Sequence, residues 1–147
     1  MGLDQYAYAV RPNKGNTDFG WVWSDEVQPE NGEAVTEIAY WRKHPNLQGW
    51  MEALWIRKRA EQGEPVQPIT DGLFAGEVVF NCQPLRLTWA DLDELEATLK
   101  RGDLPPTSGF FFGEGSDDYY LNQDLEFIKK ARQIMSQDME IYYDSWW

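Results

Sequence analysis

The sequence predicts a single α+β domain, with a small, mostly antiparallel sheet and about three to four helices packed against it. The chain of 147 residues is long enough for one hydrophobic core and too short for two ordinary domains, so residues 1–147 are treated as one domain. Strand-like and helix-like segments do not alternate in the regular order of a parallel βαβ fold. Both ends of the chain are apolar and would fray if they were unpaired, which favours paired terminal strands.

The beginning of the chain is predicted to be extended. Residues 5–10 alternate small and aromatic side chains, which is typical of a strand. Proline, asparagine and glycine at residues 12–16 indicate a turn, and residues 19–23 are a second strand candidate. Residues 25–34 are polar and are predicted to be a loop.

Two helices are predicted on either side of a proline. The first begins near Val35 or Thr36 and breaks at His44, because Pro45 disfavours helical geometry in the residue before it. The second runs from about Pro45, which suits a first helical turn, to Glu61. Its core-facing stripe comprises Leu47, Trp50 or Met51, Leu54 and Lys58.

The middle of the chain contains a loop rich in proline and glycine and then two short strand candidates, at residues 78–80 and 85–87. Thr88 and Asp91 match a capping box, which predicts a helix start. This helix is expected to end at Gly102. Its predicted buried residues are Trp89, Leu92, Leu95 and Leu99.

The last part of the chain begins with an unusual loop at residues 104–120, rich in glycine, proline and aromatic residues. A helix is predicted over roughly residues 117–136. Its core side comprises Leu121, Leu125, Ile128, Ala131 and Met135. Residues 139–143 are predicted to be a strand that pairs with the strand at residues 5–10.

The chain is acidic and rich in aromatic residues. Its formal net charge is −12, and residues 61–147 carry 17 Asp and Glu against 6 Lys and Arg. Such a surface repels phosphate backbones, which argues against general nucleic-acid binding, and it attracts basic protein surfaces. Acidic side chains also keep a small aromatic-rich protein soluble, so solubility alone is the alternative explanation.

A reducing compartment is expected because the only cysteine, Cys82, cannot form an internal disulfide. The sequence contains no apolar run near the roughly 20 residues that span a bilayer, and no signal peptide is recognised. These features predict a soluble protein inside the cell, without a membrane partner.

No catalytic, metal or cofactor site is predicted. His44 would need an orienting carboxylate and a nucleophile, and a helix break explains it more simply. Cys82 could serve as a nucleophile with His44, but a buried structural cysteine is the commoner case. Glu114, Asp117 and Asp118 could bind a divalent cation, although carboxylates near a helix start are explained by the helix dipole.

Several short segments, in order and over most of the chain, resemble a family of small phage-encoded proteins of unknown function. They are residues 1–4 (MGLD), 37–43 (EIAYWRK), 104–113 (LPPTSGFFFG), 118–120 (DYY) and 142–146 (YYDSW). The resemblance implies a phage origin and work in the cytoplasm of an infected bacterial host. Family members are often labelled phosphoglycerate kinase, but that enzyme is a much larger two-domain protein, and this chain has no phosphate loop.

One position departs from the family pattern. Relatives tend to have a histidine shortly before a tryptophan, and in this chain that position holds Gln48, before Trp50. Any function that depends on that imidazole is therefore in doubt here.

The segments that carry the resemblance concentrate aromatic, arginine and aspartate residues, which are typical of binding surfaces. Arg42 could grip an anionic ligand beside Tyr40 and Trp41, or could form a structural ion pair with Asp118 or Asp144. The predicted ligand- or partner-binding residues are Tyr40, Trp41, Arg42, Lys43, Ser108, Phe110, Phe111, Phe112, Asp118, Tyr119, Tyr143, Asp144 and Trp146.

Three functions follow as hypotheses. The first is a non-enzymatic accessory protein that binds a host protein during infection. The second is a protein that binds or sequesters a small nucleotide-like ligand in an aromatic cleft. The residues predicted to form the cleft are Tyr40, Trp41, Arg42, residues 110–112, Tyr143 and Trp146. The third is an acidic mimic of DNA, which requires carboxylates spaced like phosphates on one face.

Overall fold

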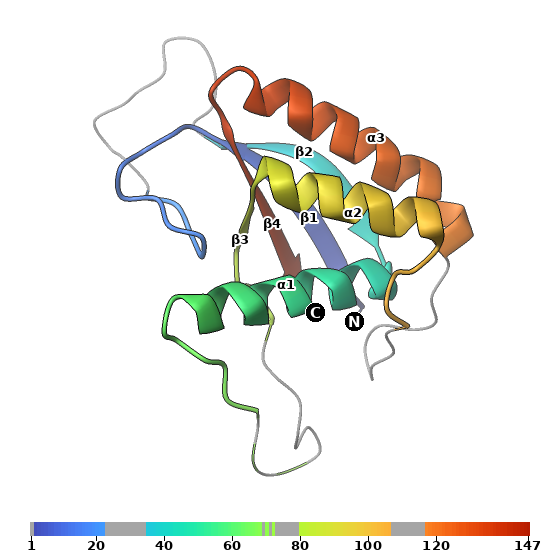
Figure 1. Cartoon of the computed structure of the whole chain (residues 1–147), viewed down its shortest axis with the longest axis horizontal. Coiled ribbons are helices and arrows are strands. Elements are labelled where there is room, and N and C mark those ends of the chain that lie inside the picture. The colour runs from blue at the N-terminus through green and yellow to red at the C-terminus, as the bar shows by residue number, and fades with distance from the viewer. Residues whose placement is uncertain (1, 23–34, 69, 71, 73–79, 107–116) are drawn as a thin grey trace.

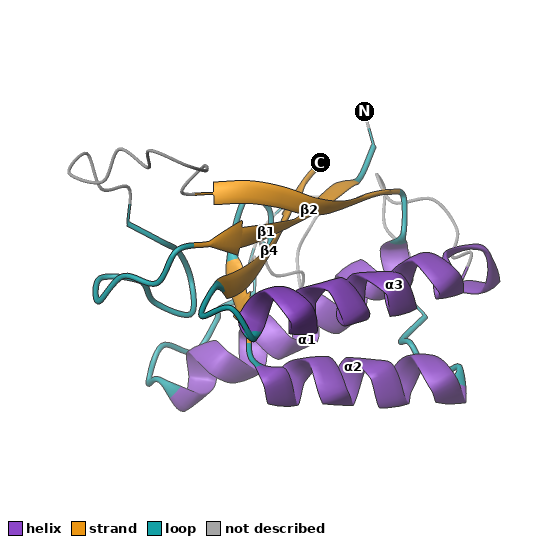
Figure 2. Cartoon of the chain, turned by 90° about the horizontal axis from the view of Figure 1, so that it is seen from above, coloured by secondary structure: helices purple, strands orange, loops and turns teal. Residues whose placement is uncertain are grey.

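The computed structural model describes residues 2–22, 35–68, 70, 72, 80–106 and 117–147, the last range without the side chains of residues 117–119. These residues form a four-stranded antiparallel sheet with three helices packed on one of its faces, as Figures 1 and 2 show. The predicted α+β class is confirmed. The elements are β1 (Asp4–Val10), β2 (Val35–Arg42), α1 (Pro45–Glu61), β3 (Leu85–Leu87), α2 (Trp89–Arg101), α3 (Asp117–Met135) and β4 (Glu140–Trp146).

The strands lie in the order β2-β1-β4-β3. The two terminal strands, β1 and β4, are antiparallel neighbours at the centre of the sheet, which confirms the predicted pairing of the chain ends. Ala7 lies opposite Tyr143, and Tyr6 lies opposite Asp144. Because side chains alternate across a strand, Ala7 and Tyr143 face the helices, whereas Tyr6 and Asp144 face the other side.

The helix predicted from residue 35 to the break at His44 is wrong, because Val35–Arg42 is the edge strand β2. A bulge explains why the strand pattern was hidden. Ala39 pairs with Ala7, but the next pair is Glu37 with Tyr8, so Ile38 is an extra residue. The bulge shifts the two-residue alternation in the middle of the strand, and β1 provides the ladder that its β-branched and aromatic residues favour.

The break before α1 lies where the proline predicted it. Lys43 has a φ of 58°, which turns the chain out of β2, and Pro45 occupies the first turn of the helix. The predicted core stripe of α1 is confirmed, because Leu47, Trp50, Met51, Leu54 and Lys58 are all buried.

The capping box of α2 is also confirmed. The Thr88 hydroxyl accepts a hydrogen bond from the Asp91 N–H, and the Asp91 carboxylate accepts one from the Thr88 N–H. Gly102 ends the helix with a φ of 69°, a left-handed conformation that glycine adopts at low cost. Trp89 was predicted to be buried but is 47% exposed; it lies at the first position of the helix, with the Arg132 guanidinium over its ring.

Three other predicted strands differ from the structure at the described residues. Residues 19–22 do not form a strand; this segment has only an isolated bridge between Thr17 and Gly20. Of the strand predicted at residues 78–80, the first two lie outside the described residues, and Phe80 is buried but not in a strand. β4 continues beyond residue 143 to Trp146, so the predicted final strand was too short.

Side chains of α3 bind the free edge of β2. The Tyr120 hydroxyl donates a hydrogen bond to the carbonyl oxygen of Arg42. The Gln123 amide donates one of 2.5 Å to the carbonyl oxygen of Tyr40. The Lys130 ammonium donates one of 3.3 Å to the carbonyl of Ile38. At the opposite edge, the Arg86 N–H of β3 donates to the backbone carbonyl of Asp18.

The hydrophobic core lies between the sheet and the helices, where Trp41, Tyr143, Leu95 and Ile128 are almost completely buried. None of the described helices is long and apolar enough to cross a membrane.

Candidate functional site

The predicted binding residues lie on opposite faces of the sheet. Trp41 and Tyr143 face the helices and are 1% and 0% exposed. Tyr40 and Trp146 face the other side and are 42% and 60% exposed, and Asp144 shares that face. The predicted cleft that combines all of these side chains therefore does not form.

The inner face contains a buried cluster around Asp124 of α3. The Trp41 indole N–H donates a hydrogen bond of 2.9 Å to one carboxylate oxygen of Asp124. His44 Nε2 lies 2.7 Å from the other oxygen, and both side chains are at most 1% exposed. An ionised carboxylate only accepts hydrogen bonds, so this contact requires the proton of His44 on Nε2. The Tyr120 ring stacks on the imidazole, with centroids 4.4 Å apart.

Gln5 of β1 holds the turn that precedes α1. Its side-chain oxygen accepts from the His44 N–H at 2.9 Å, and its amide donates to the His44 carbonyl oxygen at 3.0 Å. The same amide donates to the Tyr143 hydroxyl, which donates to Gln48. Gln48 is thus a member of a buried hydrogen-bonded network, and burial raises the pKa of Tyr143 well above its ordinary value.

A histidine held by a carboxylate is the arrangement of a general base and its orienting group. Here both side chains are at most 1% exposed, and the carboxylate is shared with the Trp41 indole inside the core. Cys82 does not complete a catalytic set: it was expected to be buried, but it is exposed. Desolvation and then the charge of Asp144 raise the pKa of its thiol, which lowers its reactivity at neutral pH. The geometry therefore assigns the Asp124 cluster a structural role.

The outer face of the sheet, which none of the described helices covers (Figure 2), carries a row of aromatic rings. Tyr6 stacks on Tyr8 with centroids 6.0 Å apart, and Tyr40 lies 5.2 Å from Tyr6. Trp21 contacts Tyr8 and Tyr142 at 5.8 and 5.1 Å. Because the Tyr142 hydroxyl also donates to the Thr17 carbonyl, the segment around Trp21 covers that end of the face.

The open end of this face is acidic. We use the name acidic aromatic patch for Asp4, Tyr6, Glu37, Tyr40, Asp144 and Trp146. Burial, followed by the charges of Asp4, Glu37 and Asp144, raises the pKa of Tyr6. Burial also raises the pKa of Asp144, and the Ser145 N–H, which donates to this carboxylate at 2.9 Å, opposes part of that rise. The hydrogen bond of 2.6 Å that Tyr40 donates to Asp4 is the main cause that raises the pKa of Tyr40 to about 12.

The acidic groups of this patch lack ion-pair partners among the described residues: none of the ten ion pairs there includes Asp4, Glu37 or Asp144. Arg42, at the border of the patch, is exposed, and the ion pairs among the described residues do not include the predicted pair of Arg42 with Asp144. Its charge lowers the pKa of Tyr40, which opposes part of the rise. Lys43 is exposed beyond the end of β2.

The remaining predicted residues cannot be placed in either face. Ser108, Phe110, Phe111 and Phe112 lie outside the described residues, as does Glu114 of the possible cation site. Asp118 and Tyr119 belong to the first turn of α3, and their side chains are outside the description. In the described ranges, no group of three or more His, Cys, Asp or Glu side chains is arranged to hold a metal ion.

The carboxylates of α2 are engaged within the protein. Asp93 and Glu96 pair with Arg132 at 2.6 and 3.0 Å, and Glu94 pairs with Arg57 at 3.2 Å. They do not form the row of free, phosphate-like charges that DNA mimicry requires, so this helix gives that hypothesis no support.

Ionisation of the tyrosines predicts a loss of stability at alkaline pH. Burial raises the pKa of Tyr142 from 10.0 to about 12, and the pKa of Tyr40 also rises to about 12. The unfolded chain releases these protons first, so the free energy of unfolding is unaffected below pH 10 and falls as the pH approaches 12. Urea unfolding followed by circular dichroism at several pH values in this range measures the fall. In Tyr40→Phe, the free energy of unfolding should decrease less over this pH range. An unchanged decrease in Tyr40→Phe would contradict the contribution of Tyr40 to the pH dependence.

The sequence-based prediction of site residues does not include several residues that the structure shows to be important. Asp124 is one of several carboxylates near the last predicted helix, and no local pattern marks it as a partner of Trp41 and His44. Tyr6 and Tyr8 could have been recognised, because the alternation of residues 5–10 places them on the face opposite Ala7.

This geometry defines the class of protein. It has an antiparallel sheet with helices on one face and an acidic aromatic surface on the other. Comparisons with family models, with curated proteins and with solved structures found no match.

Proposed function

We propose that this chain is a non-enzymatic accessory protein of a bacteriophage that binds a host protein in the cytoplasm of the infected cell. The binding surface is the acidic aromatic patch. The observation that carries the proposal is the combination of aromatic rings and carboxylates on the sheet face that the described helices leave open, where the carboxylates have no ion-pair partner among the described residues. The phage origin rests on the sequence resemblance.

The chemistry of the patch favours a partner that presents arginine or lysine side chains. Tyr6 and Tyr40 carry electron-rich ring faces, and these attract cations. The charge of Asp144 disfavours its own burial, as its raised pKa indicates, so an approaching cation removes an unfavourable interaction. Trp146 and Tyr40 add exposed apolar area of the residue types that dominate interface energies. The net charge of −12 accelerates the encounter with a basic surface.

The test compares two variants with equal net charge. Glu37→Gln/Asp144→Asn removes two charges from the patch, and the control Glu94→Gln/Asp103→Asn removes two from the helix side, where both carboxylates are exposed. A host protein retained by immobilised wild-type protein is identified by mass spectrometry and purified, and calorimetry measures its affinity for all three proteins.

We expect the patch variant to bind about tenfold more weakly and the control variant to bind like the wild type. Binding of the wild type should weaken as salt is added, because screening reduces attraction between exposed charges. Equal losses in both variants would mean that the total charge attracts the partner and would reject the patch. Retention unaffected by Glu37→Gln/Asp144→Asn would reject it as well.

A further inference from the structure

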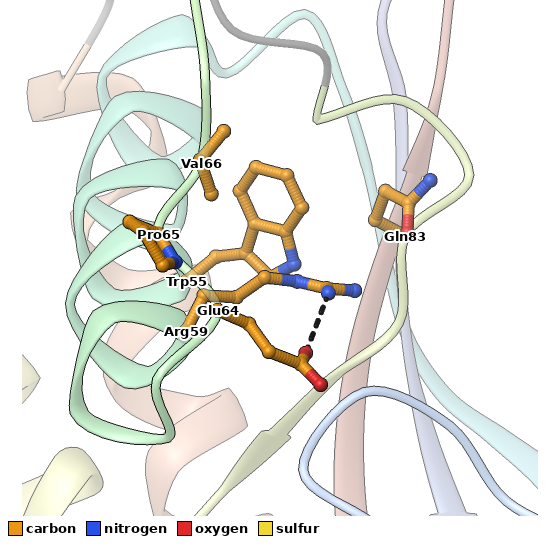
Figure 3. Close-up of a pocket in the computed structure, with 6 residues that line it drawn as sticks. All are labelled: Trp55, Arg59, Glu64, Pro65, Val66 and Gln83. Atoms are coloured by element: carbon orange, nitrogen blue, oxygen red, sulfur yellow. Dashed lines mark hydrogen bonds and ion pairs between the residues drawn. The ribbon is translucent and has the colours of Figure 1, made fainter.

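A pocket of about 550 Å³ lies beside the C-terminal half of α1, away from the acidic aromatic patch. It is lined by Trp55, Arg59, Glu64, Pro65, Val66 and Gln83, which Figure 3 shows as sticks. This volume lies in the range of small-molecule sites. Pro65 and Val66 form an apolar wall, and the opposite side holds nitrogen donors.

Two buried donors in this pocket have no acceptor among the described residues. The indole Nε1 of Trp55 and Nε of Arg59 are both inaccessible to solvent, and neither makes a hydrogen bond within the described part of the chain. Trp55 is 4% exposed, so its N–H group cannot turn toward bulk water. In Figure 3 the indole nitrogen lies on the side of the ring that faces Arg59 and Gln83. A buried N–H without an acceptor is costly, and an acceptor on a ligand would remove that cost.

Arg59 is held in place before any ligand binds. Its guanidinium carbon lies 4.3 Å from the ring centroid of Phe19 and 5.2 Å from that of Trp55. Its Nη1 pairs with Glu64 at 3.1 Å, but the Glu64 side chain is 61% exposed. An exposed pair of this kind contributes little, so another carboxylate can replace Glu64.

We propose that this pocket binds a small carboxylic acid with a short apolar body. The carboxylate accepts from Trp55 Nε1 and from the Arg59 guanidinium in place of Glu64, and the body lies against Pro65 and Val66. This inference is independent of the proposed docking function, because it uses none of the patch residues.

Titration with hexanoate, followed by the indole N–H resonances in proton–nitrogen correlation spectra, tests the proposal. The Trp55 signal is assigned from the spectrum of Trp55→Phe. We expect a saturable downfield shift of this signal, and we expect inorganic phosphate, which has no apolar body, to bind more weakly. A Trp55 resonance that hexanoate leaves unmoved would overturn the proposal.

Two variants make the test specific. Arg59→Gln should weaken hexanoate binding about tenfold or more, because a charge-assisted hydrogen bond is lost. Glu64→Gln removes the competing carboxylate from an exposed position, so it should fold normally and bind about two- to fivefold more tightly. The control Arg101→Gln changes an exposed arginine of α2 and should bind like the wild type. Unchanged affinity in Glu64→Gln would also overturn the proposal, whatever the stability of Arg59→Gln.

Discussion

Replacing Asp124 with alanine should lower the free energy of unfolding by about 3–5 kcal/mol. The carboxylate is 1% exposed and accepts from the Trp41 indole and from His44, so its removal leaves two buried donors without an acceptor. A loss of this size is a large share of the roughly 5–15 kcal/mol that stabilises a typical domain. Urea unfolding followed by circular dichroism measures it.

The matched control is Glu126→Ala, which removes an exposed carboxylate from the same helix. It should change the free energy of unfolding by no more than about 0.5 kcal/mol. Asp124→Asn should fall between the two, because one amide oxygen remains as an acceptor while the amide group adds a donor. An Asp124→Ala protein as stable as Glu126→Ala would show that the cluster contributes nothing to the fold.

The second large effect is expected at Lys58, whose ammonium lies between α1, β3 and α2. Its Nζ donates hydrogen bonds of 2.6 Å to the Arg86 carbonyl and to the Asp91 carboxylate. Lys58 and Asp91 are only 8% and 7% exposed. Lys58→Met retains the length of the side chain but leaves the Asp91 charge unpaired, so we expect a loss of about 3 kcal/mol, measured by the same unfolding experiment.

Lys100→Met is the control, because Lys100 is 65% exposed and forms a loose pair with Glu96. Its expected effect is within about 0.5 kcal/mol. Adding Asp91→Asn to Lys58→Met separates the pair from the capping box, since an Asn side chain can still accept from the Thr88 N–H. If the double variant is no more stable than the sum of the single losses predicts, Lys58 and Asp91 are not coupled, and the explanation is wrong.

The parts of the fold that were predicted correctly depend on signals within a few residues. The Thr88–Asp91 box and Gly102 mark both ends of α2, and Pro45 marks the start of α1. The prediction for β2 was wrong because the interactions that make this segment a strand are not local in sequence. The bulge at Ile38 disrupts the two-residue period, and only the ladder with β1 makes the segment a strand.

The predicted binding residues also depend on both local signals and contacts that only the folded structure makes. The sequence prediction places Tyr40 and Trp41 in one site, but neighbours in a strand point to opposite faces. Trp41 therefore became a core residue bound to Asp124, and Tyr40 became part of the acidic aromatic patch. The unpartnered donors of Trp55 and Arg59 leave no trace in sequence, because an unsatisfied N–H group is a property of the packed structure.

The side chains that bind the margins of the sheet restrict how this protein can associate. Tyr120, Gln123 and Lys130 occupy carbonyl oxygens of β2, and the Asp18 backbone occupies an N–H of β3. A strand from another molecule would have to displace these groups before it could extend the sheet, so both margins are protected against ribbon-like polymerisation. Association with another protein, or with copies of the same chain, therefore has to use side chains rather than the backbone of the sheet edges.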